Sequence, residues 1–176
     1  MTTDEYLYDT EETTRIRELA MGTMREPPAP FFSHQVIALK IARILGDHVD
    51  AFALGRVAIA PVDVVLDRDR ALVLQPDVLF IAIERLAIIR DQVWGPPDLV
   101  VEILSPRTEH SDRTEKLDWY RQYGVRECWL VEIQRELVTV VDFTGALPAT
   151  RTAGGAETIE SSVLPRLEVT AATVFG

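Results

Sequence analysis

The sequence predicts an α/β fold of the α+β type, and three observations support this class. Apolar residues recur at helical spacing from Phe32 to His48, and runs rich in β-branched residues follow them. Between Leu99 and Ile133, a strand pattern, a helix pattern and a second strand pattern succeed one another. Such a succession is typical of a crossover that joins parallel strands of one sheet. We therefore expect helices packed on a sheet, with the strand at 99–104 in its interior.

The first helix is expected over residues 32–48. Its apolar positions fall on one stripe and are Val36, Ile37, Ile41, Ile44 and Leu45. Ser33 is the expected N-cap, after the breaker formed by Pro27 to Pro30. His34 precedes Ile37 by one helical turn, so it projects from the stripe that faces the core.

Three strands are expected next, at residues 57–59, 62–66 and 78–83. A turn at 67–70 separates the second from the third, and residues 86–94 give no clear pattern.

The second half of the chain supplies the crossover. The strand at 99–104 is followed by a loop at 106–111 and a helix at 111–123, which Gly124 ends. Two further strand patterns, at 127–133 and 136–143, are separated by a short polar turn. They predict an antiparallel hairpin.

The chain is acidic, and its length suits a single domain. The 176 residues carry a net charge of -10, which opposes the broad basic surface of a protein that coats nucleic acid. Acids without Lys or Arg gather in the first twelve residues. We therefore expect a flexible acidic N-terminus over residues 1–18 and a single domain over residues 19–176.

The expected location is the cytoplasm. Cys128 is the only cysteine, so an intrachain disulfide is impossible and a reducing compartment fits. The acidic start lacks the basic and apolar regions of a secretory signal. No uncharged apolar stretch is long enough for a membrane span.

Glu102 is the residue that first indicates a functional site. It interrupts the apolar run of PPDLVVEILSP, residues 96–106, which is otherwise typical of a strand buried on both faces. Burying a carboxylate there costs several kcal/mol unless it meets a cation, a metal or a set of hydrogen-bond donors.

Asp77 and Lys116 are the residues expected to share a pocket with Glu102. Asp77 stands where a proline introduces an apolar strand, and Asp112, Lys116 and Tyr120 follow one another at four-residue spacing on one helix face. Two neighbouring carboxylates repel unless a hard cation lies between them, and Mg²⁺ takes one or two carboxylates plus phosphate oxygens. Lysine nearby can orient or deprotonate a water, or pair with the phosphate.

These residues resemble a known family. The sequence contains PD, an acid in an apolar strand 25 residues later, SP, D-x-x-x-K-x-x-x-Y and GV-x-E-x-W-L-V. This pattern resembles the Uma2 family of restriction-endonuclease-like proteins, in the PD-(D/E)XK nuclease superfamily. The similarity covers roughly residues 22–143, and the block at 97–132 is its most specific part.

The resemblance implies a fold, a cofactor and an activity. The fold is a mixed central β-sheet flanked by helices, restriction-endonuclease-like, and the domain at 19–176 is then nuclease-like. The cofactor is Mg²⁺ or Mn²⁺ on Asp77 and Glu102, with the carbonyl of Ile103 as a further ligand. The activity is hydrolysis of DNA phosphodiester bonds by a metal-activated water, with Lys116 as the third catalytic residue.

The sequence departs from the superfamily pattern in two places. An E-x-K signature would put lysine at position 104, where this chain has Leu104, so Lys116 is the expected replacement. The first helix carries His34 where the superfamily often carries an acid. His34, Asp112 and Tyr120 are the expected residues around the three catalytic ones.

Other interpretations stay open at this point. Glu102 could be a structural acid in a buried salt bridge, Asp77 a turn cap, and Lys116 a solvated lysine. Asp112 could be only a first-turn acid. The chain could be a catalytically degenerate binding or assembly module, or could hydrolyse another phosphate ester. A nuclease would bind DNA weakly and could form a homodimer through residues 127–143 or through Phe31 and Phe32.

Overall fold

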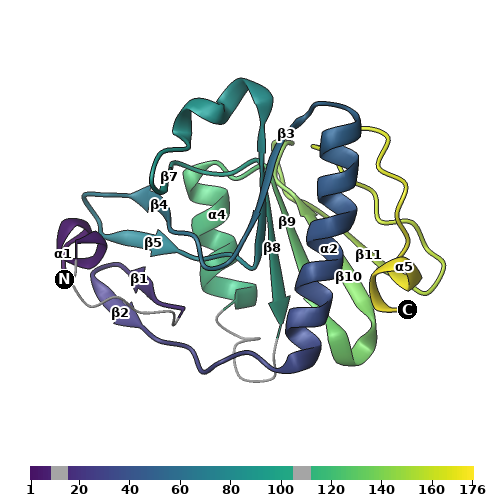
Figure 1. Cartoon of the computed structure of the whole chain (residues 1–176), viewed down its shortest axis with the longest axis horizontal. Helices are drawn as coiled ribbons and strands as arrows, with labels where there is room; N and C mark the ends of the chain where they lie inside the picture. The colour runs from purple at the N-terminus through teal and green to yellow at the C-terminus, as the bar shows by residue number, and fades with distance from the viewer. Residues whose placement is uncertain (9–15, 105–111) are drawn as a thin grey trace.

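The computed structural model describes residues 1–8, 16–104 and 112–176, and its centre is a mixed sheet of six strands (Figure 1). The strand order is β11-β10-β9-β8-β6-β3, in which β8 and β9 are parallel and every other neighbouring pair is antiparallel. The predicted fold class is confirmed. The strands are β3 (Gly55–Ile59), β6 (Val78–Ala82), β8 (Leu99–Leu104), β9 (Glu127–Glu132), β10 (Leu137–Asp142) and β11 (Ala149–Gly154).

A second, smaller sheet has the order β2-β1-β5-β4-β7, and only its β4–β7 pair is parallel. Its strands are β1 (Glu18–Ala20), β2 (Thr23–Arg25), β4 (Val64–Asp67), β5 (Leu72–Leu74) and β7 (Val93–Trp94). Only β4 was expected. Strands of two or three residues are too short to show an alternating pattern, so alternation does not identify β1, β2, β5 or β7.

The two faces of the six-stranded sheet are covered by different layers. Helix α2 (Phe32–Ala51) and the short α5 (Ala171–Phe175) pack on one face, against alternate residues such as Val101 and Ile103. Helix α4 (Leu117–Tyr123) and the smaller sheet pack on the other face. Figure 1 shows α2 and α4 on opposite sides of β8. Because strand side chains alternate between faces, Glu102 points toward α4.

The predicted crossover is confirmed as β8, α4 and β9. A π-helical turn, η2 (Asp112–Lys116), leads into α4, and Gly124 ends the helix in the left-handed conformation at a φ of 94°. Its N–H donates to the carbonyls of Tyr120 and Arg121. The hairpin is also confirmed, since β9 and β10 pair antiparallel with Cys128 opposite Val141.

The start of α2 and the segment after β6 are the places where the sequence was less informative. The N-cap of α2 is Phe31, without a side-chain hydrogen bond, so the predicted Ser33 cap is wrong. The unassigned segment forms the 3₁₀ helix η1 (Ile83–Ile88) before β7. A further 3₁₀ turn, η3 (Ile133–Arg135), joins β9 to β10.

The N-terminal segment differs from the solvated terminus that its acids predicted. Helix α1 (Thr3–Leu7) begins with a capping box between Thr2 and Glu5, and the Thr3 side chain is buried. The acid Asp4 meets Arg68 of the β4–β5 turn at 2.7 Å. One acid of the N-terminal run thus forms an ion pair with an arginine far away in the sequence, and composition alone does not show this pairing. Residues 9–15, with the other acids of that run, lie outside the described residues.

None of the helices in the described ranges combines the length and apolar composition that crossing a membrane requires.

Candidate active site

Glu102 lies in the middle of β8 and is 4% exposed, so its carboxylate is buried as the sequence predicts. The Lys116 Nζ is 3.1 Å from its Oε2 and 3.3 Å from its Oε1. The Tyr120 hydroxyl donates a hydrogen bond to Oε1. Lys116 and Tyr120 reach the same carboxylate because they lie one helical turn apart on the face of the helix that packs on the sheet.

Glu18 belongs to the same cluster, and the sequence analysis missed it. Its Oε1 lies 2.9 Å from the Lys116 Nζ and accepts a hydrogen bond from the N–H of Gln75 at 3.0 Å. The side chain is buried at the start of β1. Lys116 therefore lies between two buried carboxylates, so this group of three carries a net charge of -1 when all are ionised.

A weak signal for Glu18 was present in the sequence. Met21 and Gly22 both have positive φ, 49° and 83°, and they join β1 to β2 as a two-residue hairpin turn. Glycine at the second position is typical of such turns. Assigning residues 1–18 to an acidic terminus hid this hairpin and the acid that begins it.

Asp77 lies at the start of β6, next to Glu102. Its Oδ2 accepts a hydrogen bond from the N–H of Ile103 at 2.7 Å. β6 and β8 pair antiparallel with Val78 opposite Val101, and one further step in this register places Asp77 across from Glu102. The two acids thus come from adjacent positions on neighbouring strands. The predicted use of the Ile103 carbonyl as a metal ligand stays a prediction.

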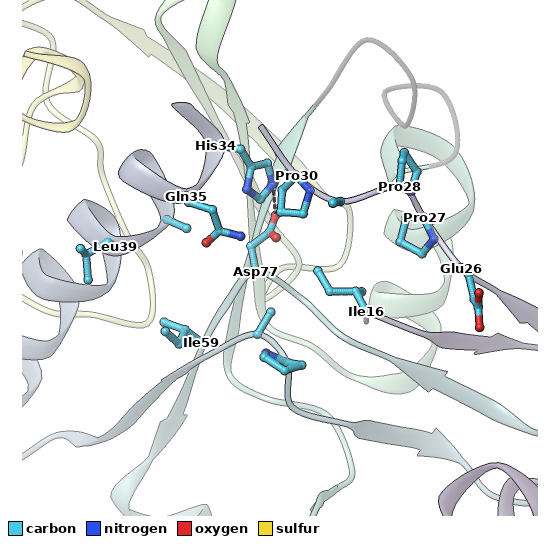
Figure 2. A pocket seen from close by; sticks show the side chains of 14 residues that line it. Ile16, Glu26, Pro27, Pro28, Pro30, His34, Gln35, Leu39, Ile59 and Asp77 are labelled. Atoms are coloured by element: carbon cyan, nitrogen blue, oxygen red, sulfur yellow. Dashed lines mark ion pairs between the residues drawn. The ribbon is translucent and has the colours of Figure 1, made fainter. Parts of the chain in front are cut away.

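His34 faces Asp77 from the first turns of α2. Its Nε2 lies 3.3 Å from the Asp77 Oδ2, and Figure 2 shows the imidazole above the carboxylate. Helix α2, which carries His34, therefore contacts the start of β6 at Asp77. Of the other residues expected near the site, Tyr120 contacts Glu102 directly, whereas the side chain of Asp112 lies outside the described part of the chain.

Tyr120 is held in its protonated form. Burial, followed by the negative charges of Glu102 and Glu18, raises its pKa well above the ordinary value of 10.0. The phenol is therefore a proton donor at neutral pH, and it fixes one oxygen of Glu102. The other oxygen is nearer to Lys116, at 3.1 Å.

Asp77 and Glu102 are the carboxylates that could hold a hard cation. Their oxygen donors and the negative charge of the cluster suit Mg²⁺ or Mn²⁺. Within the described ranges, no three His, Cys, Asp or Glu side chains form a ready-made metal cluster. Mg²⁺ commonly binds through one or two carboxylates and completes its coordination with water and phosphate oxygens, so this donor set fits that mode.

A pocket of about 730 Å³ opens beside Asp77. It lies between the N-terminal turns of α2, the proline-rich segment 27–30 and the residues that follow β3 (Figure 2). Asp77 is thus part of the wall of this pocket.

One comparison with known proteins identifies a family, and another finds a solved structure with a similar fold. The model of the Uma2 family, described as "Putative restriction endonuclease", matches residues 3–172. The fold is similar to the crystal structure of a putative nuclease belonging to DUF820 from Anabaena variabilis ATCC 29413, with a TM-score of 0.83 and 19% sequence identity, over 99% of this chain and 97% of that one. Among curated proteins no significant match was found. The match spans nearly the whole chain and includes every residue of the site, and the protein therefore belongs to the Uma2 family.

Proposed function

We propose that the protein is a metal-dependent endonuclease that hydrolyses DNA phosphodiester bonds. The observation that carries the proposal is the buried contact of Lys116 with Glu102, 3.1 Å apart, beside an aspartate that is bonded to the next residue of the same strand. Asp77 stands opposite Glu102 in the register of β6 and β8, so two carboxylates and an amine belong to neighbouring positions of the sheet and its crossover helix. This is the residue set that metal-assisted phosphoryl hydrolysis requires.

Asp77 and Glu102 would hold Mg²⁺ or Mn²⁺, with the carbonyl of Ile103 as the expected backbone ligand. Such an ion, when bound, lowers the pKa of a coordinated water and neutralises charge on the phosphate. The chain's own groups prepare this site. The Ile103 N–H and His34 fix the Asp77 carboxylate, and Tyr120 fixes Glu102.

Lys116 would orient the attacking water or pair with the phosphate. Glu18 holds the Lys116 ammonium at 2.9 Å independently of Glu102, so the lysine keeps its place when Glu102 turns to a metal. Glu18 is a positioning residue in this account, because it acts through Lys116.

The acidic surface favours a second candidate, a degenerate binding or assembly module. A net charge of -10 repels the DNA backbone, so even an active enzyme would bind DNA weakly and lose affinity steeply as salt rises. The cluster argues for activity. A binding module has no use for a lysine buried between two acids, which costs stability.

A DNA-cleavage assay tests the proposal. Supercoiled, linear and single-stranded DNA are incubated with Mg²⁺ or Mn²⁺, with EDTA as the blank. Asp77→Asn and Glu102→Gln should each abolish cleavage, and Lys116→Met should slow it. Glu160→Gln is the control, because it removes the same charge from an exposed acid. Cleavage that persists in Glu102→Gln, or that is absent from every DNA with the wild type, would overturn the proposal.

The proposal includes a homodimer in the cytoplasm, because two-fold dimers are the commonest assemblies of soluble proteins. Phe31 and Phe32 are 62% and 85% exposed at the start of α2 and are available for such a contact, as is the β9–β10 hairpin. Light scattering at micromolar concentration should give twice the chain mass. A monomeric mass would remove the dimer from the account.

A further inference from the structure

The pocket beside Asp77 has apolar walls. Its volume is about 730 Å³, within the range of small-molecule sites. Leu39 and Ile59 are 57% and 49% exposed although both are large apolar side chains, and both line the pocket. Apolar side chains with such exposure are covered when a flat or apolar ligand binds. Four prolines and Ile16 extend the apolar wall, and the prolines are Pro27, Pro28, Pro30 and Pro61.

The polar side chains of the pocket are few. His34 and Gln35 come from the first turns of α2 and lie beside Asp77 in the middle of the view, and Glu26 lies apart from them, next to Pro27 (Figure 2). Among the described residues that line it, there is no Lys or Arg. The lining therefore disfavours an anion, so the base of a nucleotide suits this pocket better than its phosphate.

We propose that this pocket takes a single unpaired nucleobase of the strand that is cut, so that the substrate is single-stranded or locally unpaired DNA. The inference rests on the proposed function, because Asp77 belongs to that site. Apolar side chains pack on the two flat faces of an extruded base, and an amide such as that of Gln35 offers both a donor and an acceptor to its edge.

The size and charge of the pocket favour an unpaired base over duplex DNA. Bases inside a duplex are stacked and paired, so a pocket of this size admits one only after it has been flipped out, which costs free energy. A single strand avoids that cost. Single strands are also held largely by their bases, and this suits a chain whose net charge of -10 gives little attraction for phosphates.

Fluorescence anisotropy with short labelled oligonucleotides, in EDTA, tests the inference without requiring catalysis. Three probes of equal length are used: single-stranded DNA, the same sequence as a duplex, and a strand of abasic sites that keeps the phosphates and lacks the bases. We expect the single strand to bind about tenfold more tightly than either of the others, since each stacked base contributes strongly to affinity.

Leu39→Trp fills the pocket and should weaken single-strand binding by about tenfold. Val36→Trp is the matched control, because Val36 lies on the same helix with 45% exposure and is not part of the pocket wall. Equal binding of the abasic and normal strands, tighter binding of the duplex, or equal effects of the two tryptophans would each overturn the inference. So would no binding of any probe.

The two proposals fail in different ways. If duplex DNA is cut as fast as single-stranded DNA and Leu39→Trp cuts normally, the pocket inference is wrong and the nuclease stands. If single strands bind in the pocket but no DNA is cut with Mg²⁺ or Mn²⁺, the hydrolysis is wrong and the pocket assignment stands.

Discussion

Two buried glutamates on neighbouring parallel strands, Glu102 of β8 and Glu127 of β9, are satisfied in opposite ways. They are 4% and 0% exposed, and the register that pairs Leu99 with Glu127 and Glu102 with Leu130 places them on different levels of the sheet. Glu127 accepts hydrogen bonds from three neutral groups, the Trp129 Nε1 at 2.8 Å, the Ser161 Oγ at 2.7 Å and the Ser162 N–H at 2.6 Å. Glu102 faces an ammonium and a phenol.

We interpret the difference as that between a structural acid, Glu127, and the acid to which the proposed function assigns a metal, Glu102. Neutral hydrogen-bond donors from β9 and from residues 161–162 surround Glu127. Its carboxylate therefore links the segment at 161–162 to the sheet through hydrogen bonds. Glu102 instead shares the Lys116 cation with Glu18, so these three groups together carry a net charge of -1 when all are ionised. Functional sites often keep such unfavourable arrangements, whereas structural networks are usually saturated.

Lys116→Met should give the largest change in stability. The variant leaves the carboxylates of Glu18 and Glu102 buried without their shared cation, and we expect the free energy of unfolding at neutral pH to fall by about 3–5 kcal/mol. Urea unfolding of the wild type and the variant at neutral pH measures the loss. A loss below about 1 kcal/mol at neutral pH would show that the cluster is solvated.

Glu102→Gln and Glu127→Gln test directly whether the two buried glutamates have different roles. In Glu127→Gln, either orientation of the new amide places its NH₂ against an N–H donor of Trp129 or Ser162. We therefore expect the free energy of unfolding to fall by about 2 kcal/mol. Cleavage per folded molecule should not change. In Glu102→Gln, the new amide oxygen still accepts the hydrogen bond from the Tyr120 hydroxyl, and Lys116 keeps its ion pair with Glu18. The expected stability change there is within about 1 kcal/mol, with cleavage abolished. The reverse pattern, a stability loss at 102 and an activity loss at 127, would exchange the two roles.

Tyr120→Phe should have a smaller effect. The variant removes the hydrogen bond to Glu102 from a buried site, and we expect the free energy of unfolding to fall by about 1–2 kcal/mol. Tyr123→Phe is the control on the same helix, because its hydroxyl bonds to Asp67 nearer the surface. Equal losses of unfolding free energy in the two variants would mean that the hydrogen bond from Tyr120 to Glu102 contributes no more than one nearer the surface.

The same tyrosine should produce a loss of stability in alkali. Burial and the neighbouring acids raise the pKa of Tyr120 in the folded state, so above pH 10 the unfolded chain releases a proton that the folded chain retains. The free energy of unfolding then falls with rising pH, by up to about 1.4 kcal/mol per pH unit for this residue. Tyr120→Phe should have the shallower slope. Equal slopes would show that Tyr120 titrates normally.

The sequence predicted most of the six-stranded sheet and two of the three charged residues of the cluster, Glu102 and Lys116. β8 was predicted over its full length because its apolar run is bounded by prolines, and Lys116 and Tyr120 were aligned by helical spacing. Glu18 was missed, because the strand that carries it has three residues and follows an acidic run. β11 was missed as well, because its exposed residues are mostly Thr, Arg and Ala, which give no apolar alternation. Periodicity finds residues that face a core, whereas an edge strand or a short hairpin depends on partners far away in the sequence.

Calorimetric titration of the wild type, Glu102→Gln and Glu160→Gln with Mn²⁺ tests the central claim most directly. If Glu102 is a metal-binding acid and not a structural one, the wild type and Glu160→Gln should bind the ion with equal affinity, and Glu102→Gln should bind at least about tenfold more weakly, since loss of one carboxylate ligand removes much of the binding free energy. Equal binding by all three proteins, or none by the wild type, would contradict the claim.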